Sequence, residues 1–374
     1  MSNDPGASGP AAIARLRKRL DAIDARIMEL VAERQLTVTR IGEQKHTAGH
    51  ALRDFARERE VIERGVRQAQ SLGMPGEVAR DVLERLIHHS LRNQEQRTLA
   101  RSEHGAGRRA LVIGGLGRMG DWMARYLDTL AYAVEIADPG PGDSLFPVIA
   151  DWRDSNLDQD VIVVAAPLRA SNQVLTELAG RRPPGLVFDI GSLKSPLKPG
   201  LESMRAAGCR IASVHPMFGP DVMMLSGRHI LLVDAGHPQA LAEATRLFSH
   251  TAADCVELGL DDHDEVMAWV LGLSHLVNIA FAGALGRLRE QLPLLQRISS
   301  STFNAQLKVA AQVVSENPSL YFEIQQGTVK YEPALRAFTE VLDTLLGAVR
   351  AGDEQAFVEI MSNARQRLAE GALL

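Results

Sequence analysis

The sequence predicts three folded parts in series: an all-α part, an α/β part with a mostly parallel sheet, and a second all-α part. Residues 11–45 contain no proline, and their apolar residues recur at helical spacing. Between residues 109 and 259, short apolar runs alternate with helix-like stretches, which is typical of a parallel sheet with crossover helices. The helical pattern resumes near residue 260, and its interruptions fall at three prolines: Pro293, Pro318 and Pro333.

These patterns set the expected domain boundaries. They are a loose tail over 1–10, a helical domain over 11–100, a linker over 101–108, an α/β domain over 109–259 and a helical domain over 260–374. A chain of 374 residues has ample length for two or three domains. The net charge of −5 gives no bias toward nucleic acid. Residues 11–101, however, hold 18 Lys and Arg against 13 Asp and Glu, so the first domain is expected to handle anions.

Cysteine usage and the N-terminus suggest a cytoplasmic protein without a metal. The two cysteines, Cys209 and Cys255, show no metal-ligand spacing, and the first ten residues lack a secretion signal. The most apolar run, residues 266–285, includes Ser274, His275 and Asn278. We therefore expect a buried helix there and no membrane span.

The first predicted helix is unusually long for a small domain. At about 1.5 Å per residue, a helix over 11–45 spans about 52 Å. Such a helix needs a partner to cover its apolar side, so an intertwined homodimer is expected. Two further helices fit residues 54–70 and 77–99, separated by the Pro/Gly-containing stretch 71–76. The strands that follow are expected at 110–113, 133–137, 161–165, 186–190, 211–214, 230–233 and 255–258.

The first of these strands leads directly into a glycine-rich turn. Its sequence is Gly115-Leu116-Gly117-Arg118-Met119-Gly120, followed by a predicted helix from about Asp121 to Leu130. The glycines permit a tight turn, close approach of a pyrophosphate and close helix–strand packing, while the helix N-terminus attracts the phosphates. Asp138, 18 residues past Gly120, ends the next strand. An acid there accepts hydrogen bonds from ribose hydroxyls and repels a 2′-phosphate, so the motif predicts a Rossmann-type domain that binds NAD rather than NADP.

Polar residues interrupt the apolar seams of the N-terminal helices. Arg34 and Lys45 are 11 residues apart on the first helix, so both point in nearly the same direction on its apolar side. Buried cations need an anion, which indicates an anionic ligand. Arg17 lies about 100° from Arg34 around the same helix and reaches a common site more easily from a second subunit. The other helices contribute further polar residues near these seams: Asp54, Arg57, Glu58, Ser90 and Gln94.

At these positions the N-terminal part resembles the all-helical class of chorismate mutase. The stretches LRKRLDAIDARIMELVAER, IGEQK, LRDFARERE and SLRNQ carry the resemblance. It implies that Arg17 (from the partner) and Arg34 hold substrate carboxylates, and that Lys45 and Gln94 face the ether oxygen. It further implies that Arg57 and Glu58 bind the carboxylate and hydroxyl ends, with Asp54 and Ser90 completing the site. The amide of Gln94 cannot ionise, so this contact should not require low pH.

Residues 109–374 resemble prephenate dehydrogenase along their whole length. The resemblance rests on VIGGLGRMG, VIVVAAP, VFDIGSLK, SVHPMFGP, HDEVMAW and LSHL. It implies an α-helical C-terminal dimerisation domain, and a cofactor site that includes Pro167. It assigns His215 as the group that accepts the substrate hydroxyl proton, Ser192 as a hydrogen-bond partner of that hydroxyl, and His275 as a carboxylate contact. His263 is expected to be structural.

The fusion resembles the bifunctional chorismate mutase–prephenate dehydrogenase family of tyrosine biosynthesis. One departure concerns Gln312, which stands where the family commonly has an arginine, six residues before Pro318. Lys308 lies one turn earlier. This departure keeps arogenate and amino-deoxyprephenate open as substrates. Two other interpretations remain: the first domain serves only in dimerisation or regulation, or the dehydrogenase acts on a hydroxy acid beneath an unrelated helical cap.

Overall fold

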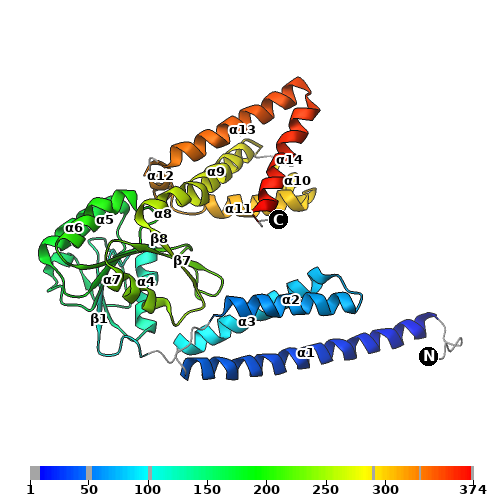
Figure 1. Cartoon of the computed structure of the whole chain (residues 1–374), viewed down its shortest axis with the longest axis horizontal. Helices are drawn as coiled ribbons and strands as arrows, with labels where there is room; N and C mark the ends of the chain where they lie inside the picture. The colour runs from blue at the N-terminus through cyan, green and yellow to red at the C-terminus, as the bar shows by residue number, and fades with distance from the viewer. Residues whose placement is uncertain (1–8, 48–52, 100–102, 289–290, 328–329, 372–374) are drawn as a thin grey trace.

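The computed structural model describes residues 9–47, 53–99, 103–288, 291–327 and 330–371. It shows a helical N-terminal part, a central sheet flanked by helices and a helical C-terminal part (Figure 1). The predicted fold class is therefore confirmed. The part of the 101–108 segment that the structure describes is a turn in which Gly105 packs against the ring of Tyr132.

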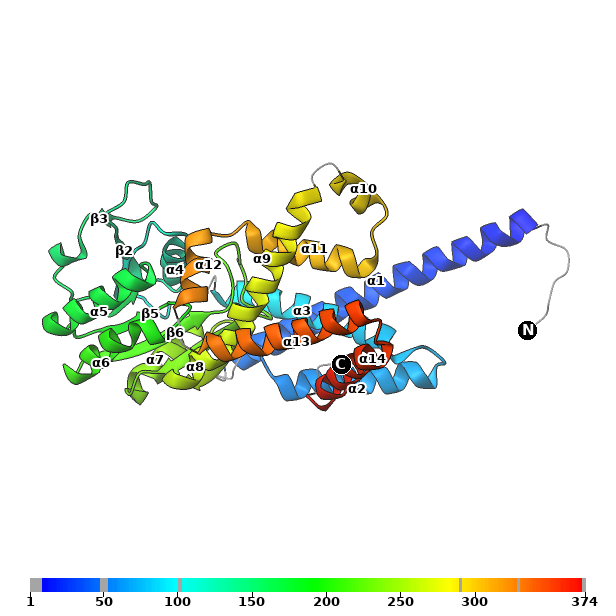
Figure 2. The ribbon, with the colours of Figure 1, turned by 90° about the horizontal axis from the view of Figure 1, so that it is seen from above.

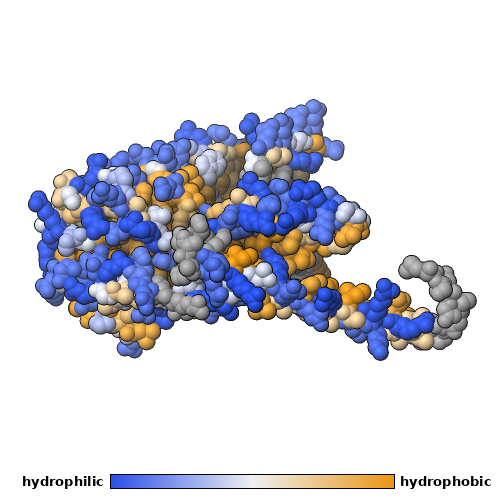
Figure 3. Space-filling model, turned by 60° about the horizontal axis from the view of Figure 1, so that its bottom comes forward, coloured by the Kyte–Doolittle hydropathy of each residue, from blue (hydrophilic) through white to orange (hydrophobic). Residues whose placement is uncertain are grey.

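The N-terminal part consists of three helices. They are α1 (Gly9–Thr47), α2 (Phe55–Ser71) and α3 (Gly76–Leu99), and α2 and α3 form an antiparallel hairpin (Figure 1). The N-terminal half of α1 projects beyond the rest of the molecule (Figure 2). Its apolar seam is exposed in the single chain, with Leu16 at 65%, Leu20 at 56% and Ile23 at 48% of full exposure. Figure 3 shows apolar side chains among polar ones on the projecting helical part.

Each of the seven expected apolar runs forms a strand, and one further strand is present. The central part contains β1 (Arg109–Ile113), α4 (Arg118–Thr129), β2 (Ala133–Ala137), β3 (Val148–Ile149), β4 (Val161–Val164), α5 (Leu168–Arg181), β5 (Leu186–Asp189), α6 (Lys198–Ala206), β6 (Arg210–Pro216), β7 (His229–Asp234), α7 (Pro238–Phe248) and β8 (Asp254–Gly259). The unexpected strand, β3, has two residues at the sheet edge, too few for a periodic signal. Short 3-10 turns lie at Trp152–Asp154 and Ser195–Leu197.

The eight strands are ordered β3-β2-β1-β4-β5-β6-β7-β8. All neighbouring pairs are parallel except β6 and β7. The first six follow the order of a doubly wound dinucleotide-binding fold, in which ligands bind at the carboxyl ends of the strands where the order reverses. Here that point lies between β1 and β4, directly beside the glycine-rich turn.

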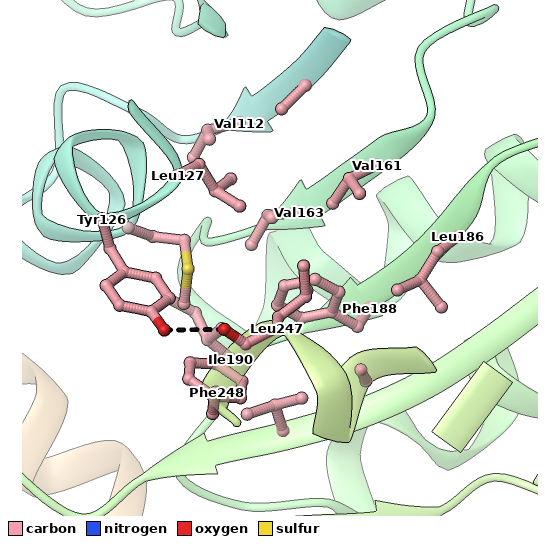
Figure 4. Close-up of a cluster of buried hydrophobic side chains, with 14 of the residues drawn as sticks. Val112, Tyr126, Leu127, Val161, Val163, Leu186, Phe188, Ile190, Leu247 and Phe248 are labelled. Carbon is pink, nitrogen blue, oxygen red and sulfur yellow. Dashed lines mark hydrogen bonds between the residues drawn. The ribbon is translucent and has the colours of Figure 1, made fainter. Parts of the chain in front are cut away.

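The sheet is buried on both faces, as parallel sheets with crossover helices generally are. Helices α4 and α7 cover one face, where Tyr126, Phe188 and Phe248 pack together (Figure 4). The Tyr126 hydroxyl donates a hydrogen bond to the Leu247 carbonyl at 2.8 Å, so the one polar atom of this ring is satisfied inside the core. Helices α5 and α6 cover the other face.

The C-terminal part consists of helices and the short turns that join them within its described residues. It comprises α8 (Leu260–Met267), a π-helical turn (Ala268–Leu273), α9 (Ser274–Leu285), a 3-10 turn (Gly286–Leu288), α10 (Leu292–Arg297), α11 (Ser301–Val314), α12 (Pro318–Gln326), α13 (Tyr331–Ala351) and α14 (Glu354–Glu370). The three prolines that interrupt the pattern occupy the first turns of α10, α12 and α13, where no helical hydrogen bond is lost.

The expectation of a buried helix at 266–285 is wrong for the single chain. The continuous helical stretch Leu260–Leu288 is long and apolar enough to cross a membrane by length and composition, and only 22% of its most apolar window is buried. Trp269 and Val270 are each about half exposed, at 49% and 47%. The apolar side of this stretch therefore lacks a covering element within the described chain.

The N-terminal and central parts meet through a buried carboxylate. Glu95 of α3 is fully buried and accepts hydrogen bonds from the backbone amides of Leu225 at 2.6 Å and Ser226 at 2.9 Å. Burial raises the pKa of Glu95, and these amide hydrogen bonds partly offset that effect. The contact fixes α3 against the loop that leads from β6 to β7.

Candidate active sites

The glycine-rich turn joins β1 to α4 so closely that side chains at its glycines would collide with neighbouring atoms. A Cβ atom on Gly120 would lie 2.1 Å from the Gly114 carbonyl oxygen, and one on Gly117 would lie 3.2 Å from the same oxygen. Gly114 itself has a positive φ of 85°, which favours glycine. The turn is therefore a cradle that side chains would fill, and it exposes backbone amides at the N-terminus of α4.

Asp138 ends β2 beside this turn. One carboxylate oxygen accepts a hydrogen bond from the Leu116 amide at 3.1 Å, and the other accepts one from the Gly140 amide at 2.9 Å. The acid is thus held at the position that meets the ribose in this type of fold. Pro167 precedes the first residue of α5, after β4, on the other side of the switch point.

The remaining turn residues fix the cradle to its surroundings. Leu116 and Met119 pack against the core beneath α4. Arg118 forms ion pairs with Asp221 and with Glu316, each at 3.1 Å. Because Glu316 follows α11, Arg118 links the nucleotide-binding turn to the C-terminal helices.

His215 lies near the end of β6 in a chain of buried polar side chains. Its Nδ1 is 2.9 Å from Nε2 of His263, and Nδ1 of His263 is 2.7 Å from the Asp264 carboxylate. All three side chains are buried, with exposures of 3%, 0% and 1%. The Asp264 carboxylate also accepts hydrogen bonds from the backbone amides of Lys194 and Ser195 at 2.8 and 2.7 Å.

These contacts determine where the ring protons lie. Burial would raise the pKa of Asp264, but hydrogen bonds from His263, Ser195 and Lys194 outweigh it and lower the pKa to about 2. The ionised carboxylate can only accept, so His263 carries its proton on Nδ1 and presents an unprotonated Nε2. His215 must then donate from Nδ1 to His263. Its own Nε2 is left unprotonated, which makes it a hydrogen-bond acceptor and a base.

The electrostatic surroundings keep His215 neutral. Burial lowers its pKa well below the usual histidine value, and the neighbouring His263 and Lys194 lower it further. Burial likewise lowers the pKa of His263, although Asp264 opposes this shift. The pair therefore stays neutral at neutral pH, and His215 remains able to accept a proton.

Ser192 lies in a turn that the buried ion pair of Lys194 and Asp189 holds in place. The Lys194 ammonium donates to the Asp189 carboxylate at 2.7 Å and to the carbonyls of Gly191 at 2.8 Å and Val214 at 2.9 Å. Because Val214 precedes His215, the same ammonium connects the Ser192 turn to the strand that carries His215. Ser192 itself is partly exposed beside these groups.

His275 lies on α9, two residues after the π-helical turn ends at Leu273. Its ring stacks on Tyr321 of α12 with a centroid separation of 4.3 Å. Its Nδ1 is buried and finds no hydrogen-bond partner among the described residues, and burial lowers its pKa. Within the described chain no hydrogen bond joins His275 to His215 or Ser192. Gln312 and Lys308 both lie exposed on α11.

The N-terminal helices enclose a separate cavity of about 320 Å³. Six of the predicted site residues line it together: Arg34, Asp54, Arg57, Glu58, Ser90 and Gln94. Arg34 donates to Ser90 Oγ at 3.0 Å, and burial lowers the pKa of its guanidinium. Gln94 donates to the Val38 carbonyl at 2.7 Å beside Gly42, where a Cβ would lie 2.8 Å from the amide nitrogen.

The residues of α2 on this cavity are held by local contacts. Asp54 caps the helix by accepting from the Arg57 amide at 3.0 Å. Glu58 pairs with Arg53 at 3.1 Å, and Arg57 pairs with Glu60 at 2.5 Å. The cavity thus combines three arginines, two carboxylates and two neutral polar side chains with an apolar remainder, which suits an organic anion that also carries a hydroxyl group.

Of the two remaining predicted residues, Arg17 does not line this cavity, and the side chain of Lys45 is not described. Arg17 is exposed on the projecting half of α1, 17 residues from Arg34, or about 25 Å along the helix. It cannot reach the cavity of its own chain. Lys45 lies on α1, but its side chain is outside the described residues.

Three residues at the candidate sites were not predicted from the sequence. Arg64 also lines the cavity, and its spacing of seven from Arg57 is the signal that places both on one helix face. His263, expected to be structural, contacts His215 directly, and Asp264 orients it. These two are 48 and 49 residues from His215 in sequence, so only the folded arrangement reveals the relationship.

Comparisons with known proteins match three separate stretches of the chain. The sequence matches the family of chorismate mutase type II over residues 16–95. It matches the nucleotide-binding domain of prephenate dehydrogenase over 149–257 and the dimerization domain of the same family over 260–363.

Full-length and partial relatives also match. A T-protein of Enterobacter agglomerans is 22% identical over 97% of this chain and 94% of its own length. A 4-amino-4-deoxyprephenate dehydrogenase of Streptomyces pristinaespiralis is 28% identical over 70% of this chain and 92% of its own. A crystal structure of prephenate dehydrogenase from A. aeolicus superposes with a TM-score of 0.54 at 17% identity, covering 70% of this chain and 98% of that one.

Fold and sites together define an enzyme with a dinucleotide-binding dehydrogenase part and an attached helical part built for an organic anion. The chain belongs to the family that joins a type II chorismate mutase domain to the nucleotide-binding and dimerization domains of prephenate dehydrogenase.

Proposed function

We propose that this enzyme converts chorismate to prephenate in the N-terminal cavity and then oxidatively decarboxylates prephenate to 4-hydroxyphenylpyruvate, with NAD as cofactor. The proposal rests on one observation: a single chain carries both an arginine-containing cavity of about 320 Å³ and, at the carboxyl end of a parallel sheet, a dinucleotide-binding turn and a buried neutral histidine. The family membership of the three domains supports the same pair of reactions in tyrosine biosynthesis.

The first reaction needs no nucleophile and no proton transfer. The ether C–O bond of chorismate breaks while a C–C bond forms in one pericyclic step, so the protein contributes by holding the compact conformer and stabilising charge on the ether oxygen. Arg34 and Arg57 face the substrate carboxylates in this proposal, and Glu58 accepts from the ring hydroxyl. Gln94 donates to the ether oxygen, a contact for which Lys45 is the second candidate. Arg17 of the partner subunit completes the site.

The second reaction uses His215 as the base. Bound NAD supplies the hydride acceptor for the carbon that carries the ring hydroxyl. Nε2 of His215 accepts the hydroxyl hydrogen as the oxygen becomes carbonyl-like. The ring carboxylate then leaves as CO2, its electron pair closes the aromatic ring, and the proton returns to the phenol oxygen. Ser192 donates to the same oxygen, and His275 meets a substrate carboxylate.

The protein residues at the glycine-rich turn fit NAD. The amides at the start of α4 and the side-chain-free cradle of Gly115, Gly117 and Gly120 would hold the pyrophosphate. The Asp138 carboxylate would accept the ribose hydroxyls and repel a 2′-phosphate.

A second candidate substrate follows from Gln312. A neutral amide on α11 replaces the commonly basic residue, and one relative is a 4-amino-4-deoxyprephenate dehydrogenase. Arogenate or amino-deoxyprephenate would then replace prephenate in the second reaction. Comparison of kcat/KM for the three compounds distinguishes them.

The exposed apolar faces of α1 and of Leu260–Leu288 support a homodimer in which a second copy covers both faces, and we propose that this dimer is cytoplasmic. One assay tests the whole proposal: chorismate and NAD are supplied, and NADH formation is followed. Arg34→Ala should block NADH formation from chorismate but not from prephenate, whereas His215→Ala should block both. Absence of NADH from both chorismate and prephenate in the folded wild-type enzyme would refute the proposal.

A further inference from the structure

A second polar cavity, of about 500 Å³, lies between α3 and the loop that leads from β6 to β7. Its wall includes His88 and Arg92 from α3, and Ser226 and Arg228 from the loop. We call it the seam cavity, because its two walls belong to the chorismate mutase domain and to the nucleotide-binding domain. Neither proposed reaction uses it.

Helix α3 separates the two cavities. Ser90 and Gln94 face the chorismate mutase cavity, and the four-residue spacing from one to the other keeps them on one side of the helix. His88 and Arg92, also four residues apart, lie about 160° away and face the seam cavity. The seam cavity is therefore not an extension of the first site.

The charges around the seam cavity are not balanced. Arg92 and Arg228 form no ion pair within the described part of the chain. The cavity's own acid, Asp221, is engaged by Arg118 at 3.1 Å. Glu95 lies behind the wall with its carboxylate bonded to the amides of Leu225 and Ser226. Burial lowers the pKa of His88, and the charges of Arg92 and Arg228 lower it further, so His88 is a neutral hydrogen-bond donor here.

A buried hydroxyl points to a ligand independently of these charges. Ser226 lines the cavity and is 4% exposed, yet its Oγ finds no hydrogen-bond partner among the described residues. Buried hydroxyls are normally satisfied, and an unsatisfied one costs about 1–3 kcal/mol. Because this oxygen has almost no accessible surface, an acceptor in the cavity would satisfy it once the side chain turns toward the cavity.

The geometry points to a binding site for a small organic dicarboxylate in the seam cavity. Arg92 and Arg228 approach from different elements, so each guanidinium can take one carboxylate, and Ser226 donates to one of them. A cavity of about 500 Å³ suits a ring-sized molecule better than an inorganic ion. Because the ligand would contact both α3 and the loop, it would hold the two domains together at this seam.

Titration of the full-length enzyme tests this site with isophthalate as a ring dicarboxylate, benzoate as its monocarboxylate counterpart and inorganic phosphate. The Arg34→Ala background removes the competing anion contact of the chorismate mutase cavity. We expect calorimetry to show an isophthalate site that Arg92→Ala or Arg228→Ala weakens at least tenfold. Ser226→Ala should weaken it several-fold, since one hydrogen bond is lost.

Arg80→Ala is the matched control, because Arg80 lies on α3 and its described ion-pair partner is Glu84 of the same helix. Isophthalate binding should be unchanged in this variant. Equal affinity in all variants, or equal weakening by Arg80→Ala, would overturn the site. Benzoate or phosphate binding as tight as isophthalate would overturn the dicarboxylate assignment. NADH formation from prephenate is measured in parallel, so failure of the seam site is distinguishable from failure of the proposed reactions.

Discussion

His263 lies between His215 and Asp264, with Nε2 2.9 Å from one ring and Nδ1 2.7 Å from the carboxylate. The carboxylate thereby sets the tautomer of two histidines in succession. These two hydrogen bonds leave Nε2 of His215 unprotonated at the end of β6, near the carboxyl ends of the parallel strands. A histidine at the same place without the hydrogen bonds to His263 and Asp264 could carry its proton on either nitrogen.

Asp264→Asn should remove this control. The amide can donate to His263, which favours the opposite tautomer in both rings and leaves a proton on Nε2 of His215. We expect kcat of the dehydrogenase reaction to fall by about 10²–10⁴-fold, the usual contribution of a positioned base. The KM for NAD should change little, since the glycine-rich turn is untouched. Steady-state kinetics with prephenate provide the measurement.

Asp262→Asn serves as the control for this change, because Asp262 lies on the same helix and is exposed. Circular dichroism establishes that the Asp264 variant is folded, which matters because Asp264 also binds the amides of Lys194 and Ser195. Wild-type kcat in the folded Asp264→Asn enzyme would show that the Asp264 carboxylate does not set the tautomer of His215.

The buried histidines also predict how activity and stability depend on pH. The pKa of His215 is lowered in the folded state, so its basic form persists to more acidic pH than in a free histidine. The acid limb of kcat/KM for prephenate should therefore lie below about pH 6.5, the ordinary histidine value.

The lowered histidine pKa values should also make the folded protein less stable as pH falls. Below about pH 6.5 the unfolded chain binds protons at His215 and His263 that the folded chain does not, so the free energy of unfolding decreases as pH falls. Asp264 adds a second loss at lower pH: its stabilisation is present above about pH 4 and disappears as pH falls toward its folded pKa of about 2. Urea unfolding between pH 5 and 8 measures the histidine effect, and His215→Gln should show a flatter dependence.

Gln94→Glu should make the chorismate mutase reaction depend on pH. The amide donates a hydrogen bond at every pH, whereas a glutamic acid donates only when protonated. We expect near wild-type activity at acidic pH and a loss of about 10²–10³-fold at pH 8, comparable to removal of one transition-state donor. Prephenate formation is followed by absorbance across pH 4.5–8. A pH profile parallel to that of the wild-type enzyme would mean that Gln94 does not contact the ether oxygen.

Gly120→Ala should impair nucleotide binding. The added Cβ would lie 2.1 Å from the Gly114 carbonyl oxygen, so the turn and α4 must separate, which displaces the amides that face the pyrophosphate. We expect the KM for NAD to rise at least about tenfold, since 1.4 kcal/mol of binding is a factor of ten. Gly180→Ala on α5 is the control, because a Cβ there meets no atom within 4 Å among the described residues. Equal KM values in the two variants would contradict the assignment.

Local patterns in the sequence were sufficient to predict the fold and the cofactor turn, but not the surroundings of His215. Gly115 to Gly120 and Asp138 could be found because strand, turn and helix follow one another directly. Arg34, Ser90 and Gln94 could be found because polar residues interrupted apolar seams. The contact between His215 and His263 depends on the fold bringing α8 next to the end of β6, and the ion pair of Lys194 and Asp189 depends on burial. Neither arrangement produces a periodic pattern in the sequence. The exposed apolar side of Leu260–Leu288 was mistaken for a buried one because composition alone does not reveal which chain covers it.

Arg17 provides the sharpest test of how two copies of the chain cooperate. It lies about 25 Å along α1 from Arg34, and the apolar residues around it are exposed, so a second copy that covers this seam would bring Arg17 to the partner's cavity. Arg17→Ala and Arg34→Ala should each abolish chorismate turnover. When the two variants are co-expressed, half of the dimers are mixed, and each mixed dimer has one intact site and one doubly altered site. We expect about a quarter of wild-type activity to return.

Arg26→Ala, whose ion pair with Glu29 is exposed on α1, is the control that should keep full activity alone. If co-expression restores nothing although the mixed dimer is isolated, Arg17 does not act across the interface.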